Sequence, residues 1–397
     1  MTPERRRVLG WLGSVLMGQT ALGGLAFATQ PKPLYIAVNA EFGQPKSQAA
    51  QSIEKGVALA VAEINQKGGV LGRPLQVLRR DDRGLPARAI SNIRELAADP
   101  DVLAVLCGRY SPVALDSVPV VNELGMIYLV PWAAADPIAN NGYKPNFVFR
   151  LSMKDSWAVE AMLGHVQKRR LRRLTVSLPN TSWGRSNLAA IDAQMKRLPG
   201  VAYDIVWHNW GDTDFSALSQ RIREHGSDGL FMVANESEGQ HILAAVAEMR
   251  PAERPPIIAH WGITAADFNQ MTGGLAHQLD LVTVQTFSFV GKQNERRASV
   301  LASANRHLNE DVRRLPGLVG FAHAYDLTYL LIQAVTRAGS TDRRRIRQAL
   351  ENLGSHEGLV RQYRRPFSDE NHEGLSREQV FVARYATDGS LFREDSR

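Results

Sequence analysis

Cysteine is almost absent from the sequence, and its scarcity excludes two kinds of site. The chain of 397 residues has a single cysteine, Cys107, so a disulfide within the chain and a cysteine-based metal site are both ruled out. The amino-terminal segment contains no cysteine, and we expect no lipid anchor there. Cys107 ends the apolar run 102–107, which favours a buried, unreactive thiol. We therefore expect the fold to be stabilised by packing alone.

Catalytic motifs are missing as well. The sequence has no G-x-S-x-G elbow, no H-E-x-x-H pair and no G-x-x-x-x-G-K-[ST] loop, and its ten histidines are dispersed. We predict a protein with no catalytic residues, no metal site and no cofactor, which is not an enzyme. An enzyme is the alternative, and incubation with candidate ligands separates the two, because a binding protein returns its ligand unchanged.

Basic residues outnumber acidic ones without forming a nucleic-acid surface. The formal net charge is +7, with 44% hydrophobic and 22% charged residues, which is the composition of a folded chain. Beyond the amino terminus, short basic clusters lie at 168–173, 343–347 and 361–365. Between them they contain a single aromatic residue, Tyr363, which is less than the aromatic interleaving of nucleic-acid grooves. We expect solvated helix ends there and no nucleic-acid partner.

The first 28 residues have the pattern of an export signal. Arg5–Arg7 precede the apolar run Val8–Phe27, and Ala26–Ala28 form the small-x-small pattern of a cleavage site. Glycines and polar residues make this run a poor membrane span. We predict a signal peptide over residues 1–28 and a periplasmic location. The arginine pair also resembles a twin-arginine signal, which directs export of folded proteins; a structural amino-terminal helix is the alternative.

After this segment, short apolar runs alternate with stretches of helical periodicity. Continuous apolar strands between amphipathic helices indicate a parallel sheet that is covered on both faces. The first series predicts strands at 34–38, 75–78, 102–107 and 126–130, with helices at 53–64, 87–98 and 113–124. The second predicts strands at 174–178, 202–207, 229–233, 257–259 and 281–284, with helices at 153–169, 184–197, 214–225 and 237–249.

Two such series are too long for one sheet, and this predicts two lobes. The predicted fold class is α/β, with two lobes that each hold a parallel β-sheet flanked by helices on both faces. Helices are expected at 294–312, 318–338 and 342–352, followed by apolar runs at 359–363 and 379–385. We assign residues 29–150 plus 285–358 to the amino-terminal lobe and residues 151–284 plus 359–397 to the carboxy-terminal lobe.

An ordered set of segments resembles a known family. Residues 54–65, EKGVALAVAEIN, run into GGVLGRPL at 68–75, and an Asp-Asp pair follows at 81–82. PWAAADP at 131–137, FVFR at 147–150, DFSAL at 214–218 and Tyr325-Asp326 follow in order. This set resembles the periplasmic solute-binding proteins of branched-chain amino acid ABC transporters, which have the type I periplasmic binding fold. The resemblance covers roughly residues 34 to 390.

The resemblance implies a ligand between the lobes and a membrane partner. It implies hinge crossovers, closure over a small molecule, and delivery to an inner-membrane ABC permease by what we expect to be a monomer. A periplasmic ligand-sensing subunit of a signalling receptor is the alternative role. In parallel sheets, ligands bind beyond the carboxyl ends of the strands, so the loops after Val38, Cys107, Val130, Leu178, Val233 and Ala259 are expected to line the cleft.

The clamp for an amino acid is largely absent from those loops. The family holds the α-carboxylate with hydroxyls at positions that match Pro112 and Ala134 here, with Ser111 close by. Its acidic partner for the α-amino group corresponds to Trp261, and a pocket aromatic corresponds to Asn235. An ammonium without a partner in a closed cleft is costly, which argues against a free α-amino acid.

Aromatic residues replace that clamp. Rigid aromatic walls suit planar or apolar ligands, and Arg109 could grip a carboxylate with both arms of its guanidinium. We predict an apolar or aromatic carboxylate as the ligand. Glu41 and Glu236 could instead accept an amine, which leaves an amino acid or amide as the alternative. The predicted ligand-binding residues are Glu41, Arg109, Tyr110, Ser111, Trp132, Ala133, Ala134, Trp183, Asn235, Glu236 and Trp261.

Overall fold

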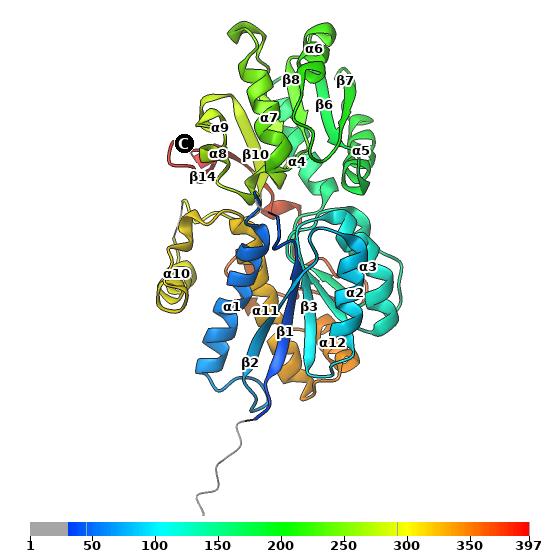
Figure 1. Ribbon diagram of the computed structural model, residues 1–397, viewed down its shortest axis with the longest axis vertical. Helices are drawn as coiled ribbons and strands as arrows, with labels where there is room; N and C mark the ends of the chain where they lie inside the picture. Colours follow the sequence, from blue (N-terminus) through cyan, green and yellow to red (C-terminus); the bar gives the residue numbers. More distant parts are fainter. Residues whose placement is uncertain (1–30, 45, 292, 397) are drawn as a thin grey trace, which may run out of the picture. The chain divides into compact units, whose positions relative to one another are not determined.

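A computed structural model describes residues 31–44, 46–291 and 293–396. The predicted signal peptide, residues 1–28, lies outside these described residues. Residues 32–397 form one compact unit, and this unit contains two large sheets. The prediction of two lobes, each built around a sheet with helices on both faces, is confirmed (Figure 1).

The first sheet has five parallel strands in the order β2-β1-β3-β4-β5. Alternate side chains along each strand point to opposite faces. Ile36 and Val38 therefore pack with helices α1 and α11, whereas Ala37 packs with α2 and α3. The elements are β1 (Leu34–Ala40), α1 (Ala49–Gln66), β2 (Leu75–Asp81), α2 (Pro86–Ala97), β3 (Val102–Cys107), α3 (Ser111–Leu124), β4 (Ile127–Val130), β5 (Val148–Arg150) and α11 (Leu318–Ala338).

The second sheet has seven strands in the order β14-β13-β10-β9-β8-β6-β7. Strands β6 to β10 are parallel, and β13 is antiparallel to β10. Helices α4 and α5 cover one face, and α6 and α7 cover the other. The elements are α4 (Asp155–Lys168), β6 (Arg173–Pro179), α5 (Ser182–Met195), β7 (Ala202–His208), α6 (Ser216–His225), β8 (Gly229–Met232), α7 (Glu236–Ala247), β9 (Ile257–Ala259), β10 (Leu281–Gln285), β13 (Phe381–Tyr385) and β14 (Leu391–Arg393).

The carboxy-terminal third differs from the sequence prediction at several elements. The short helices α8 (Phe268–Met271) and α9 (Leu275–Gln278) and the strand β11 (His356–Glu357) were not predicted. The predicted helix 294–312 ends early, as α10 (Glu295–Leu308), because Asn309 adopts a left-handed conformation with φ of 52°. Strand β14 was not predicted; it is short and only half-buried, so it lacks an apolar run. Helix α12 (Arg343–Glu351) lies within its predicted range.

Helices α1 and α11 cross closely at Gly56. A β-carbon at Gly56 would lie 2.2 Å from the backbone oxygen of Phe321, and a real β-carbon does not approach an oxygen so closely. Gly164, inside α4, is exposed and has open space at the same position. The two glycines are both helical, but only Gly56 is required by packing.

This difference predicts opposite effects for the same substitution. Gly56→Ala is expected to lower the free energy of unfolding by about 1–3 kcal/mol, because α1 must move away from α11. Gly164→Ala is expected to raise it by about 0.5–1 kcal/mol, because alanine favours helix. Urea denaturation of both variants measures the two changes, and two effects of the same sign would contradict this packing.

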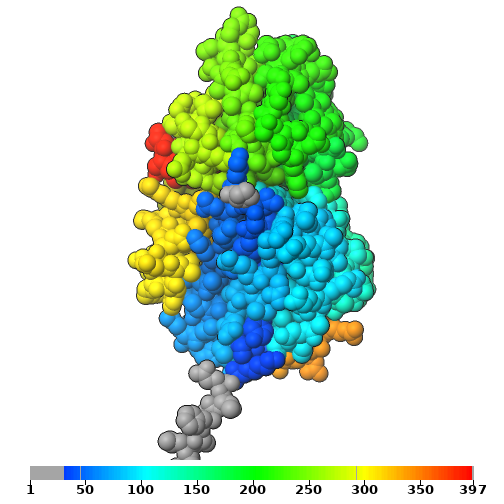
Figure 2. All heavy atoms as spheres, in the orientation of Figure 1, coloured from blue at the N-terminus to red at the C-terminus, as the bar shows by residue number. Residues whose placement is uncertain are grey.

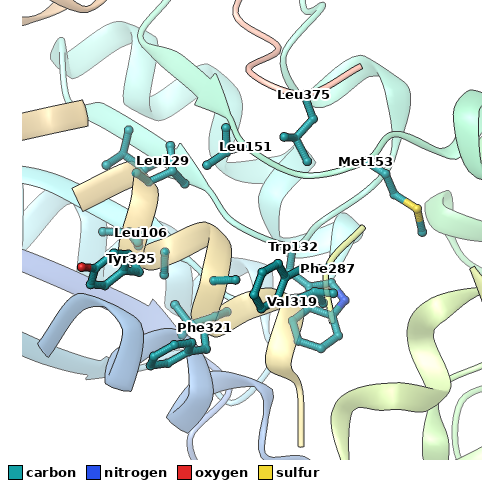
Figure 3. Close-up of a cluster of buried hydrophobic side chains, with 14 of the residues drawn as sticks. Leu106, Leu129, Trp132, Leu151, Met153, Phe287, Val319, Phe321, Tyr325 and Leu375 are labelled. Carbon is teal, nitrogen blue, oxygen red and sulfur yellow. The ribbon is translucent and has the colours of Figure 1, made fainter. Parts of the chain in front are cut away.

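Three chain crossovers connect the lobes, and they share one buried cluster. Leu151 and Met153 follow β5, Phe287 follows β10, and Leu375 precedes β13. All four are buried in the same apolar cluster, with Trp132 beside Phe287 (Figure 3). The segments that connect the lobes are therefore packed together.

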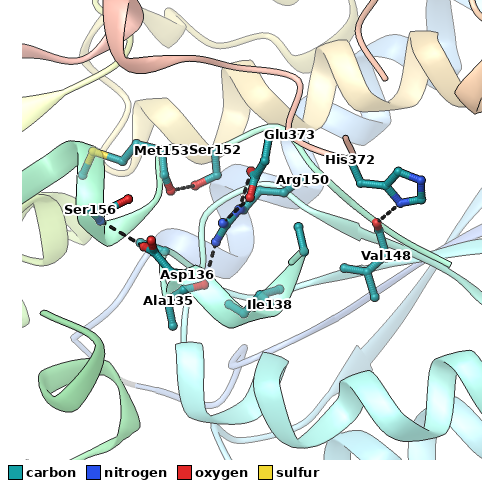
Figure 4. Close-up of polar contacts among 12 residues, drawn as sticks. Ala135, Asp136, Ile138, Val148, Arg150, Ser152, Met153, Ser156, His372 and Glu373 are labelled. Atoms are coloured by element: carbon teal, nitrogen blue, oxygen red, sulfur yellow. Dashed lines mark hydrogen bonds and ion pairs between the residues drawn. The ribbon is translucent and has the colours of Figure 1, made fainter. Parts of the chain in front are cut away.

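An ion pair ties two of these crossovers. The Arg150 guanidinium, at the end of β5, donates to both carboxylate oxygens of Glu373 at 2.8 and 2.5 Å and to the carbonyl of Ala135 at 2.8 Å (Figure 4). The backbone of Arg150 also bonds to His372 and Gly374. The Arg150 side chain is fully buried, so these contacts supply its hydrogen bonds.

Candidate functional site

A single cavity gathers residues from the carboxyl ends of strands in both sheets. Loops after β3 and β4 contribute from the first sheet, and loops after β6, β7, β8 and β9 contribute from the second. Such strand ends are where parallel sheets bind ligands. The lining residues are Arg109, Tyr110, Ser111, Trp132, Ala134, Trp183, Trp210, Asn235, Trp261 and Gly262.

The cavity is small and only partly open. It offers about 10 Å³ of space, which is close to the room that one water molecule needs. In the space-filling view, the atoms of the two lobes meet without an open channel on the face shown (Figure 2). With the lobes in this position, the cavity is too small for a metabolite.

Aromatic rings from the two lobes contact each other across the cavity. Trp132, which follows β4, lies with its ring centroid 5.7 Å from that of Trp261, which follows β9. Tyr110, which follows β3, lies 4.8 Å from Trp210 in the loop after β7. Both pairs are tilted contacts of the kind that aromatic side chains prefer. Each pair therefore joins a ring of the first lobe to a ring of the second.

The buried carboxylate of Asp155, which does not line the cavity, orients Trp183. Its indole Nε1 donates to Oδ1 of Asp155 at 3.1 Å, and Nε2 of His260 lies 3.2 Å from the same oxygen. Asp155 and His260 are completely buried. Gly262 allows this packing, because a β-carbon there would lie 2.7 Å from the Trp183 ring. The contacts fix the tryptophan at the cavity wall.

Arg109 has the only charged side chain among the lining residues, and both of its Nη atoms are hydrogen-bonded, whereas its buried Nε has no hydrogen-bond partner among the described residues. Its Nη2 donates to Oε1 of Glu236 at 2.8 Å, and its Nη1 donates to Oε2 of the same carboxylate at 2.5 Å. Its Nη2 also contacts the Tyr110 hydroxyl at 3.0 Å, and its Nε lies 3.5 Å from Oε1 of Glu41. The Arg109 and Glu236 side chains are each 2% exposed.

Carboxylates outnumber the guanidinium in this region. Burial raises the pKa of Glu41, although Arg109 opposes the rise. Burial, reinforced by Glu41, raises the pKa of Asp82 to about 7. Burial likewise raises the pKa of Tyr110 to about 12, so its hydroxyl stays protonated. The surroundings of Arg109 therefore hold carboxyl groups that accept protons far more readily than exposed ones.

The structure brings eight of the predicted ligand-binding residues to the cavity wall. Glu41 and Glu236 lie behind that wall, where they hold Arg109. Ala133 lies elsewhere, in the apolar cluster between the first sheet and helices α2 and α3. The eight that line the cavity are Arg109, Tyr110, Ser111, Trp132, Ala134, Trp183, Asn235 and Trp261.

Trp210 and Gly262 line the cavity but were not predicted. Trp210 follows β7, which is an edge strand of the second sheet, and the loop after this strand was not among those expected to line the cleft. An aromatic residue shortly after a strand end was the available signal. Its indole Nε1 is buried and has no hydrogen-bond partner among the described residues, so it is an unused donor.

Comparisons with known proteins agree on one family. A family model described as periplasmic binding protein matches residues 33–390. The Leu/Ile/Val-binding protein BraC3 of Rhizobium johnstonii is 24% identical over 331 residues, which cover 81% of this chain and 84% of that protein.

Solved structures share the fold. A type 1 periplasmic binding protein from Bordetella pertussis Tohama I superposes with a TM-score of 0.81 at 21% identity, covering 91% of this chain and all of that one. An ABC transporter solute-binding protein from R. palustris in complex with 4-hydroxybenzoate gives a TM-score of 0.77 at 16% identity, covering 91% and 96%. At these identities the likeness shows the fold alone.

Proposed function

The chain belongs to the periplasmic binding protein family, and from this premise we propose that it captures a small apolar or aromatic carboxylate between its lobes and delivers it to an ABC transporter. This family consists of binding proteins of transporters and not of enzymes. The proposal includes export to the periplasm by the signal peptide at residues 1–28. It also includes the lobe assignment of residues 29–150 plus 285–358 and 151–284 plus 359–397.

One observation carries the ligand class: four tryptophans from both lobes line one cavity. Trp132 comes from the first lobe, and Trp183, Trp210 and Trp261 come from the second. Flat, rigid rings bury large apolar areas at low entropic cost. A ligand with an apolar or aromatic body therefore gains most from closure.

The polar groups at the wall favour a carboxylate over an ammonium. The unpartnered indole Nε1 of Trp210 and the amino-terminal end of helix α3 present donors, and Arg109 adds a guanidinium that is paired with Glu236 in this structure. No acidic side chain lines the described cavity, so a primary ammonium would lose its hydration without gaining a charged partner. A carboxylate at one end of an apolar body suits both features.

Relatives bind ligands of compatible chemistry. BraC3 is named for leucine, isoleucine and valine, and the R. palustris protein was solved with 4-hydroxybenzoate. Each of these ligands combines a carboxylate with an apolar or aromatic body. The lack of an acidic side chain among the described lining residues supports the second of these two chemistries.

Calorimetric titration of matched acids and amides tests this ligand class. The protein is unfolded and refolded to remove any bound molecule, and is then titrated with benzoate, 4-hydroxybenzoate, phenylacetate and hexanoate, each beside its neutral amide. At least one acid is expected to bind about 10-fold or more tightly than its amide, because a charge-assisted hydrogen bond is worth about 1.5–3 kcal/mol. Equal binding of acid and amide, or binding of leucine alone, would contradict the proposal.

A further inference from the structure

The Arg109–Glu236 ion pair joins the two lobes. Arg109 follows β3 in the first lobe, and Glu236 begins helix α7 in the second. The two residues are 127 positions apart in the chain. Both arms of the guanidinium bind both oxygens of one carboxylate, which is the strongest geometry for such a pair. This contact therefore closes the cleft at its charged end.

The ion pair occupies the Arg109 guanidinium, which is the group that a ligand carboxylate would bind. Besides Glu236, the Arg109 guanidinium contacts the Tyr110 hydroxyl and the carbonyl of Gly262, the latter at 3.3 Å from Nη1. Its Nε faces Glu41. Both Nη atoms are therefore occupied while Glu236 stays in place, and the Nε that lacks a hydrogen bond is directed at Glu41. An incoming anion must therefore displace Glu236 before it can use Arg109.

We propose that Glu236 is a tethered competitor, whose carboxylate occupies the Arg109 fork in place of a ligand carboxylate and holds the lobes closed on its own. That the incoming ligand group is a carboxylate rests on the proposed function. That Glu236 holds the lobes closed does not rest on it. Glu236 thereby sets a minimum binding free energy that a ligand must supply in order to be captured. Only ligands that fill the tryptophan-lined cavity and also replace the ion pair recover the free energy that opening costs.

The surroundings of Glu236 explain why one ligand group can replace it. When a ligand carboxylate replaces that of Glu236, the buried Arg109 guanidinium stays paired. Leaving this buried charge unpaired would cost much more free energy. The groups that face the pair are Glu41 at the end of β1, Tyr110 after β3, and Tyr385 on β13. All of these are acids or neutral groups, so none can replace Arg109 as the partner of a carboxylate.

The chain offers a matched control on the same helix. Glu238 lies two positions further along α7 and is equally buried, at 1% exposure. Its carboxylate accepts from the backbone of Gly211 and the hydroxyl of Ser237, and no contact joins it to Arg109. Replacing Glu238 by Gln removes the same charge from the same helix end without touching the interlobe pair.

Small-angle X-ray scattering of the refolded, ligand-free protein tests the closure. The wild type and Glu238→Gln are expected to scatter as closed lobes, and Glu236→Gln is expected to show a larger radius of gyration. Glu236→Asp, in which the carboxylate retreats by one methylene, is the second variant and gives the same readout should the glutamine variant not fold. An open wild type, or variants at position 236 that stay as compact as the wild type, would overturn the proposal.

Titration with the tightest acid found for the wild type tests the competition separately. Glu236→Gln is expected to bind that acid about 10-fold more tightly than the wild type, because the competing carboxylate is gone, and Glu238→Gln is expected to match the wild type. Equal affinity in all three proteins overturns the competition, although the proposed function stands. If no acid binds any variant but the variants at position 236 still show a larger radius of gyration, closure by Glu236 is supported and the proposed carboxylate function fails.

Discussion

Replacing Arg150 by methionine is expected to lower the free energy of unfolding by about 3–5 kcal/mol, because removal of one member of a buried ion pair leaves the other without compensation. The lost guanidinium binds Glu373, whose side chain is 11% exposed, and the carbonyl of Ala135. These contacts connect β5 with the crossover that leads back into the second lobe. Guanidinium chloride denaturation measures the change.

A double-mutant cycle separates the ion pair from general damage. Glu373→Met alone leaves a buried cation, whereas Arg150→Met together with Glu373→Met removes both charges. The double variant is expected to be more stable than Arg150→Met alone. If the two losses simply add, Arg150 contributes through its bond to Ala135 and its packing, and the ion pair does not hold the crossovers.

Truncation of Trp261 to alanine is expected to cost about 3–5 kcal/mol of unfolding free energy and to abolish tight ligand binding. Trp261 is 1% exposed and contacts the rings of Trp132 and His323 from the first lobe. Its removal opens a void at the point where the lobes meet, and the ligand loses one aromatic wall. Chemical denaturation and calorimetric titration measure the two losses.

Trp207 provides the matched control. It stands on β7 of the same lobe and is 43% exposed, so Trp207→Ala is expected to change stability by no more than about 0.5 kcal/mol. Ligand affinity is expected to stay at the wild-type value. A comparable loss of ligand affinity in both variants would show that the effect is not specific to the cavity.

The fold could be predicted closely because the buried strands and helices have apolar patterns that can be recognised within short stretches of sequence. Residues 102–107 are apolar without interruption, and all of them are buried as β3. Helix α11 begins and ends where its apolar periodicity begins and ends, since Gly317 and Gly339 flank it in left-handed conformations. Strand β14 escaped prediction because three half-exposed residues at a sheet edge need no apolar pattern.

The candidate site was predicted less completely, because its contacts join residues far apart in the chain. Loops after strands could be assigned to one edge of each sheet, which placed Trp183 and Trp261 together. The pairing of Asp155 with His260 links α4 to the end of β9 and leaves no local signal. The same holds for Arg109 and Glu236, whose attraction depends on how the lobes close. Arg109 was predicted to face a ligand carboxylate, and the structure shows a protein carboxylate in contact with it.

A crystal structure of the protein purified with its natural ligand tests the central claim most directly. The account predicts a small carboxylic acid between Trp183 and Trp261, with its carboxylate on the guanidinium of Arg109 and the Glu236 side chain moved away. A ligand held outside the tryptophan-lined cavity, or one seated there while Glu236 remains on Arg109, would contradict it.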